Sequence, residues 1–150
     1  MNFEEELSSE LVKHSESMAS SLKALFANIP ENTREIHIEV FASQDGDGMF
    51  SVYVSLDGPD LHLLNKAIER YASLFEPKYV DSTINPYIPT VDPFDVDFEV
   101  NDVVVDCVAN WINSIWERPK VLDSNIPVIV WANGSFGTVT PLELGGCKST

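Results

Sequence analysis

The chain has 150 residues, of which 44% are hydrophobic and 22% charged; this composition is typical of a globular domain and excludes a disordered chain. It carries 24 Asp and Glu against 9 Lys and Arg, a formal net charge of −15. A surface this negative repels nucleic acid and anionic membranes and attracts basic proteins. We therefore predict no nucleic-acid partner and no membrane partner.

The N-terminus and the cysteines predict a cytoplasmic location. Residues 1–6 include three glutamates where a secretory signal would be basic and then apolar. No apolar run approaches the roughly 20 residues that span a bilayer. Cys107 lies in a helical pattern and Cys147 in a glycine-rich tail. Two such different settings do not favour a disulfide and fit a reducing compartment.

In the first half of the chain, the apolar periodicity predicts helices on both sides of a hairpin. Leucines and other apolar residues at helical spacing predict one long helix over residues 3–29, ended by Pro30. Residues 36–40 and 50–56 alternate apolar and polar side chains and flank a turn rich in Asp and Gly, which predicts an antiparallel hairpin. An apolar stripe then predicts a helix from Leu61 to Phe75.

In the second half, an irregular stretch precedes three further elements. Residues 79–93 contain three prolines and predict a loop of about fifteen residues. Residues 94–100 alternate apolar and acidic side chains, which predicts a strand. Asn101 is expected to cap a helix that runs to about Glu117. The runs 126–131 and 136–142 are joined by Asn-Gly-Ser, which predicts a second hairpin.

These elements predict an α+β fold with the order α-β-β-α-β-α-β-β. Two hairpins and a lone strand can join in one mainly antiparallel sheet of about five strands, with helices packed on one face. We predict a single domain over residues 1–144 and a flexible tail over residues 145–150.

The patterns that carry catalytic or metal chemistry are incomplete. The Asp-Gly-Asp-Gly turn that begins at Asp45 resembles the start of a calcium loop, but Leu56 occupies the twelfth position, where a glutamate is needed. The three histidines show no zinc spacing, and Ser135 does not lie in a nucleophile elbow. We therefore predict no catalytic residue, no metal and no cofactor.

Acidic residues gather in one window. From residue 79 to residue 117 the chain has eight Asp and Glu and no Lys or Arg. On the predicted strand 94–100, alternate carboxylates would share one face about 6.7 Å apart. That face can be a solvated edge, a surface that binds a basic partner, or, with a neighbouring carboxylate, a Mg²⁺ or Mn²⁺ site using Asp95 and Asp97. The residues we predict to bind a partner are Tyr79, Asp81, Tyr87, Asp92, Asp95, Asp97 and Glu99, with Phe94 beside them.

The chain resembles several kinds of bacterial protein. Its size, its acidity and the segment Asp95-Val96-Asp97-Phe98-Glu99 resemble the immunity proteins of toxin–immunity systems. Its segments 43–50, 55–61 and 137–142 look like parts of an uncharacterised bacterial domain family. Small acidic type III secretion chaperones, which dimerise, are also similar in class and length.

These observations lead to three hypotheses of function. The first is a non-catalytic binding protein of the immunity or inhibitor type, which neutralises a basic protein such as a toxin. The second is a dimeric secretion chaperone, and the sequence leaves a homodimer open. The third is a metal-dependent enzyme that uses Asp95 and Asp97 as ligands.

Overall fold

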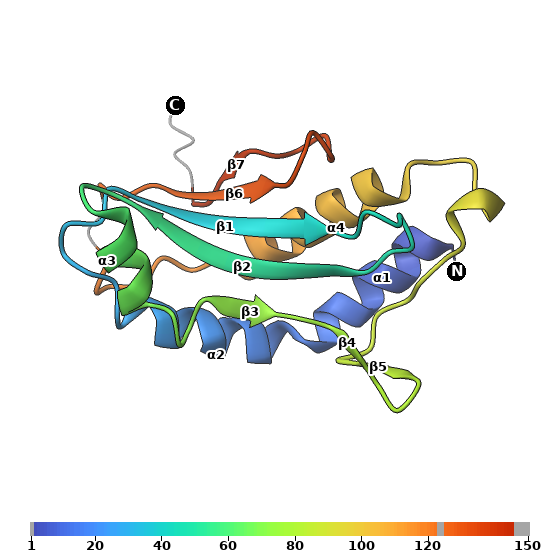
Figure 1. The fold of residues 1–150 in the computed structure, drawn as a ribbon, viewed down its shortest axis with the longest axis horizontal. Coiled ribbons are helices and arrows are strands. Elements are labelled where there is room, and N and C mark those ends of the chain that lie inside the picture. The colour runs from blue at the N-terminus through green and yellow to red at the C-terminus, as the bar shows by residue number, and fades with distance from the viewer. Residues whose placement is uncertain (1, 123–124, 146–150) are drawn as a thin grey trace.

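The computed structural model describes residues 2–122 and 125–145, so the predicted tail beyond residue 145 lies outside the described residues. The described residues form an α+β fold in which helices cover a five-stranded sheet (Figure 1). The elements are α1 (Phe3–Lys13), α2 (Ser15–Phe26), β1 (Glu35–Ala42), β2 (Phe50–Asp57), α3 (Leu61–Ala67), β3 (Ser73–Phe75), β4 (Lys78–Val80), β5 (Thr83–Asn85), the 3₁₀ turn η1 (Pro93–Asp95), α4 (Val100–Ile115), β6 (Val128–Ala132) and β7 (Leu142–Glu143).

The sheet has the strand order β3-β2-β1-β6-β7 and is mixed. Strands β1 and β2 are antiparallel, as are β2 with β3 and β6 with β7, whereas β1 and β6 are parallel. The predicted α+β class is confirmed, but the sheet contains a parallel pair that the sequence did not predict. A crossover through α4 returns the chain to the start of β1, as parallel neighbours require.

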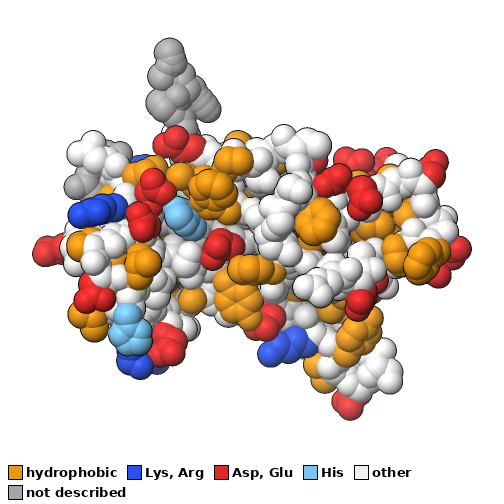
Figure 2. All heavy atoms as spheres, turned by 45° about the horizontal axis from the view of Figure 1, so that its top comes forward, with side chains coloured by type: hydrophobic (Ala, Val, Ile, Leu, Met, Phe, Trp, Pro, Cys, Tyr) orange, Lys and Arg blue, Asp and Glu red, His pale blue; other side chains and the backbone are white. Residues whose placement is uncertain are grey.

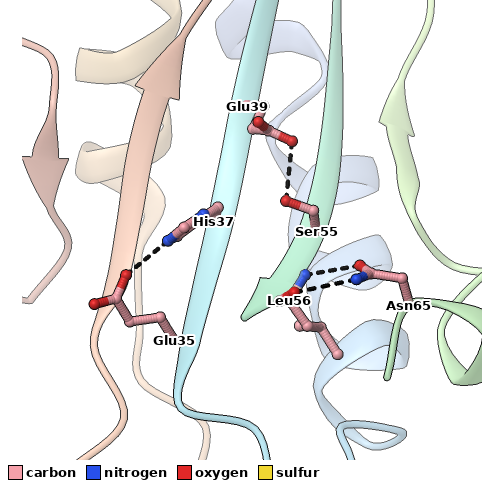
Figure 3. Close-up of polar contacts among 6 residues, drawn as sticks. All are labelled: Glu35, His37, Glu39, Ser55, Leu56 and Asn65. Atoms are coloured by element: carbon pink, nitrogen blue, oxygen red, sulfur yellow. Dashed lines mark hydrogen bonds and ion pairs between the residues drawn. The ribbon is translucent and has the colours of Figure 1, made fainter. Parts of the chain in front are cut away.

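The two central strands bury alternate residues, as their sequence pattern predicts. In β1, Ile36, Ile38 and Val40 are fully buried, and in β2 the residues from Val52 to Leu56 alternate between buried and half-buried. Helix α4 contacts β1, α2 contacts β3, and α1 packs against α4 on this buried side. The other side of the sheet stays open, and Figure 3 views it with the helices behind the strands.

The helix predicted over residues 3–29 is interrupted at His14, which separates α1 from α2. The His14 ring packs against Phe75 of β3, with ring centroids 5.3 Å apart. The hydroxyl of Ser15 accepts a hydrogen bond from the Trp111 indole of α4, at 3.0 Å. Side chains from two distant elements therefore occupy the position of the break, which the local periodicity could not indicate.

The helix predicted from Leu61 to Phe75 ends at Ala67, and residues 73–75 form strand β3 instead. The backbone N–H of Val54 donates to the carbonyl of Ala72 at 2.8 Å, and β3 continues this pairing with β2. An uncovered β2 edge would leave backbone groups without partners, and this requirement overrides the apolar stripe.

The strand predicted over residues 94–100 is wrong. Residues 93–95 form η1, and α4 begins at Val100 after Glu99, so the helix starts one residue before the predicted cap, Asn101. The apolar residues of the alternation do not share a buried face, because Phe94 is 94% exposed and Phe98 39% exposed while Val100 is buried. The loop predicted over residues 79–93 also contains the β4–β5 hairpin.

The second hairpin is confirmed as an antiparallel pair, β6 with β7, but its connection is longer than the predicted Asn-Gly turn. The side chain of Asn133 pairs with the backbone of Ala42 at the end of β1 instead of closing a tight turn. The following residues are drawn onto α4, where Asp102 accepts the N–H of Gly137 at 2.7 Å. Asp106 accepts three hydrogen bonds from Thr138 and Val139, at 2.7 to 3.0 Å.

Replacing Asp106 with alanine should destabilise the fold, because three donors of the β6–β7 connection lose a charged acceptor at once. Hydrogen bonds to charged groups contribute about 1.5–3 kcal/mol, so we expect a loss of about 2–3 kcal/mol in the free energy of unfolding. Urea denaturation followed by circular dichroism measures it. The matched control is Asn110→Ala, an exposed position one turn later on α4, where we expect a change within about 0.5 kcal/mol. Equal effects at both positions would contradict this role of Asp106.

Candidate functional site

The most unusual exposed segment runs from Asp92 to Glu99, and we call it the acidic edge. Its four acidic residues, Asp92, Asp95, Asp97 and Glu99, are all exposed. Phe94 stands among them with 94% of its surface accessible to water. Figure 2 shows acidic side chains around hydrophobic ones at the right-hand end of the molecule, where Figure 1 places η1. The edge therefore combines an exposed aromatic side chain with several exposed carboxylates.

Local hydrogen bonds fix the shape of this edge. The Asp92 carboxylate accepts the N–H of Phe94 at 2.9 Å, and the N–H of Asp95 donates to the Asp92 carbonyl at the same distance. Pro93, at the start of the turn, restricts its φ angle. Phe94 is thus presented on an ordered turn and not on an unconstrained loop.

Both ends of the segment are attached to the turn between β1 and β2. Before the edge, the N–H of Val91 donates to the carbonyl of Asp47 at 2.9 Å. After it, the buried side chain of Asn101 donates to the carbonyl of Ser43, also at 2.9 Å. The β1–β2 turn therefore holds the base of the segment that carries Phe94.

Within the part of the chain that the structure describes, no cationic side chain forms an ion pair with the carboxylates of the acidic edge. The ion pairs seen within residues 2–122 and 125–145 join Lys13 to Glu10, Lys66 to Glu69 and Lys78 to Glu76, and the contact of His37 with Glu35 is a further one when His37 is protonated. None of them involves the acidic edge. Its negative charge therefore remains available to an outside cation.

The other residues predicted to bind a partner lie apart from the acidic edge. Tyr79 belongs to β4, Asp81 to the tip of the β4–β5 hairpin, and Tyr87 to the connection that follows. All three are exposed, Tyr79 by 63% and Tyr87 by 49%. Figure 1 shows the hairpin and η1 as separate projections. The structure thus keeps Asp92, Asp95, Asp97 and Glu99 on one short segment. It places Tyr79 and Asp81 on the β4–β5 hairpin and Tyr87 on the connection after it.

The remaining acids of the 79–117 window have other surroundings. Asp102 and Asp106 hold the β6–β7 connection, so they are structural. Glu117 follows α4 and lines a cavity of about 460 Å³ between α2 and the end of α4. Lys23, Arg118 and Lys120 line the same cavity, with Phe26 and Trp116 among its apolar walls. The acidic residues that are neighbours in the sequence window therefore lie at separate places in the structure.

The open face of the sheet is a second candidate surface, and the sequence indicated only part of it. The polar side of the first predicted strand, with Glu35, His37 and Glu39, lies on this face. His37 Nε2 is 2.7 Å from a Glu35 oxygen, and the Ser55 hydroxyl donates to Glu39 at 3.0 Å (Figure 3). Trp131 of β6 joins them only because β6 pairs with β1, and the sequence did not predict this pairing.

A tyrosine and a glutamate interact at the margin of the open face. The Tyr53 hydroxyl is hydrogen-bonded to the Glu76 carboxylate, which raises the pKa of Tyr53, and partial burial raises this pKa further. The same hydrogen bond lowers the pKa of Glu76. The pair therefore keeps a charged carboxylate beside an oriented aromatic ring.

Among the residues that the structure describes, no three His, Cys, Asp or Glu side chains are arranged to hold a metal ion. The pairing of Asp95 and Asp97 as ligands on one strand face loses its basis, because residues 94–100 are not a strand. Within the described residues, no helix has both the length and the apolar character needed to cross a bilayer.

Comparison with known proteins gives one match. A family of unknown function, DUF6389, matches residues 1–146. The chain belongs to this family. The resemblance to an uncharacterised domain family is thus confirmed, while the match shows no immunity-protein family. No curated protein and no solved structure matches the chain.

Replacing Tyr53 with phenylalanine should raise the pKa of Glu76 toward its ordinary value, because the carboxylate loses one hydrogen-bond donor and keeps only that of Ser73, at 3.2 Å. A carboxyl with a lowered pKa contributes stability above its ordinary pKa, and this contribution is lost as the pH falls through the lowered value. The stability difference between the two proteins should therefore shrink on acidification. Carbon-13 NMR titration of the glutamate carboxyls measures the pKa, with Tyr87→Phe as the control. An unchanged Glu76 pKa would refute the interaction.

Proposed function

We propose that this protein is a non-catalytic binding protein that recognises a basic protein partner through the acidic edge. The observation that carries the proposal is Phe94, an aromatic side chain with 94% of its surface exposed on a hydrogen-bonded turn. Exposure of so large an apolar side chain among charges brings no stability to the isolated fold. Burial against a partner would supply the favourable free energy that the ring lacks in water.

The composition of the edge favours a protein partner over a small ligand. Binding hot spots are enriched in large side chains that enter a partner's pocket, and a projecting phenylalanine has this form. Small molecules instead prefer concave sites. The surrounding carboxylates would direct a basic partner to the edge, and such steering can raise association rates to about 10⁸ M⁻¹s⁻¹ at low salt.

In its most specific form, the proposal is that of a cytoplasmic immunity-type or inhibitor-type protein. Toxins that act on nucleic acid carry basic surfaces that bind phosphates, and the acidic edge would stand in for those phosphates. The net charge of −15 supports this form, because it attracts a basic protein over long distances.

The two other hypotheses have less support. A chaperone-like dimer would use a large apolar self-interface, and the open sheet face would be its natural location. That face carries Glu35, Glu39 and Asp57. In a two-fold dimer the same face of both subunits comes together, so these carboxylates would lie close to the carboxylates of the second subunit and repel them. A metal enzyme would need further ligands beside Asp95 and Asp97, and these two residues do not share a strand face.

Replacing Phe94 with alanine should weaken partner binding by about 2 kcal/mol or more, mainly through faster dissociation. Affinity capture from the native host would supply the partner, and surface plasmon resonance would then measure both rates. The triple variant Asp95→Asn, Asp97→Asn, Glu99→Gln should instead slow association by about tenfold at low salt and reduce its salt dependence.

The matched control replaces three exposed acids elsewhere, Glu16, Glu31 and Glu69, with glutamine. Glu4 is unsuitable as a control, because it lines the same hollow as Asp97. Equal slowing by both triple variants would show that only net charge matters. A Phe94→Ala variant that binds as tightly as the unmodified protein would place the interface elsewhere.

A further inference from the structure

The open sheet face carries one row in which an acidic residue lies between two aromatic residues. Glu39 of β1 pairs with Tyr53 of β2 on one side and with Trp131 of β6 on the other. Neighbouring strands are about 4.8 Å apart, and paired residues point to the same face. Glu39 therefore stands between an aromatic residue of each adjacent strand, on the side of the sheet where the strand residues are half-buried or exposed.

Neighbouring side chains hold both rings. The Trp131 and His37 rings form a T-shaped pair with centroids 5.6 Å apart, and His37 Nε2 is 2.7 Å from a Glu35 oxygen. The Tyr53 ring meets Phe41 at 6.1 Å, and its hydroxyl is hydrogen-bonded to Glu76. Because these contacts already restrict the rings, a ligand that stacks on them loses little further side-chain freedom.

The face is accessible to solvent. Trp131 is 38% exposed and Phe41 40% exposed. Figure 2, in which this face comes forward, shows hydrophobic, acidic and histidine side chains intermixed across it. Ser55 donates to one oxygen of Glu39, and the other oxygen has no hydrogen-bond partner among the described residues. The outward residues of β1, β2 and β6 include no Lys or Arg.

We propose that Trp131, Glu39 and Tyr53 form a recognition site for an arginine side chain of a protein partner. A planar guanidinium stacks on aromatic faces and donates two parallel hydrogen bonds to a carboxylate, whereas the ammonium of lysine is a strongly hydrated point charge. Cations within about 6 Å of a Trp or Tyr ring gain further attraction from its π electrons. The row supplies both kinds of contact at one place.

The shape of the face indicates that the arginine belongs to a protein. Free small molecules bind in hollows that bury most of their surface, while this site lies on an open sheet. A protein segment can lie across the sheet and add contacts beyond the single side chain. The site is separate from the acidic edge, so this inference does not depend on the function proposed for that edge.

The test is an NMR titration with acetyl-Gly-Arg-Gly-amide as the probe. The indole N–H of Trp131 should shift and saturate at millimolar peptide, while Trp111, which is buried and bonded to Ser15, should stay unchanged. The matching lysine peptide should bind about threefold or more weakly. The variant Glu39→Gln keeps the shape of the side chain and should weaken binding by about five- to tenfold. The control Glu16→Gln removes one charge from α2 and should leave binding unchanged.

Each outcome decides the proposal. Equal binding of the arginine and lysine peptides, or equal loss in Glu39→Gln and Glu16→Gln, would reduce the site to general negative charge and contradict it. Tighter binding of free L-arginine than of the peptide would identify a small-molecule site instead. A Trp131 signal that moves no more than that of Trp111 would show that the row binds no guanidinium. Circular dichroism of Glu39→Gln verifies that the variant is folded.

Discussion

Burial of the central sheet on one side is the constraint on which the other features depend. Alternate residues of β1 and β2 enter one hydrophobic cluster under the helices, which also takes in residues as distant as Phe3 and Leu144. Because the side-chain period of a strand is two, the remaining residues must face the other way. The same constraint thus builds the core and presents Glu39 and Tyr53 to the solvent. A one-residue shift of register would exchange the two sets.

The sequence predicted the elements whose patterns are local and failed where distant partners decide. The alternation in residues 36–40 and 50–56 and the apolar face of α4 are determined within each segment, and all three elements are present. The break at His14 depends on β3 and α4, and the short α3 depends on the open edge of β2. The alternation of apolar and acidic residues after Pro93 does not form a strand, because the Asp92 side chain accepts the N–H of Phe94 and closes the turn η1 at the start of this segment.

The candidate sites, too, could be predicted from the sequence only where they do not depend on contacts between distant segments. The acids of the 79–117 window are visible in the sequence, but their division is not, because only tertiary contacts assign Asp102 and Asp106 to the β6–β7 connection. The row of Trp131, Glu39 and Tyr53 spans three strands that are distant in sequence. Its parallel pairing has no local signal, so no pattern within a single segment could have placed Trp131 beside Glu39.

The anchoring of residues 91–101 at both ends has a consequence for how this family can diversify. Hydrogen bonds from Val91 and from Asn101 to the β1–β2 turn close the base of this segment. Exposed side chains between the two anchors contribute little to the core, so their replacement leaves the scaffold intact. The exposed residues around position 94 can therefore change while the anchored base of the segment stays the same.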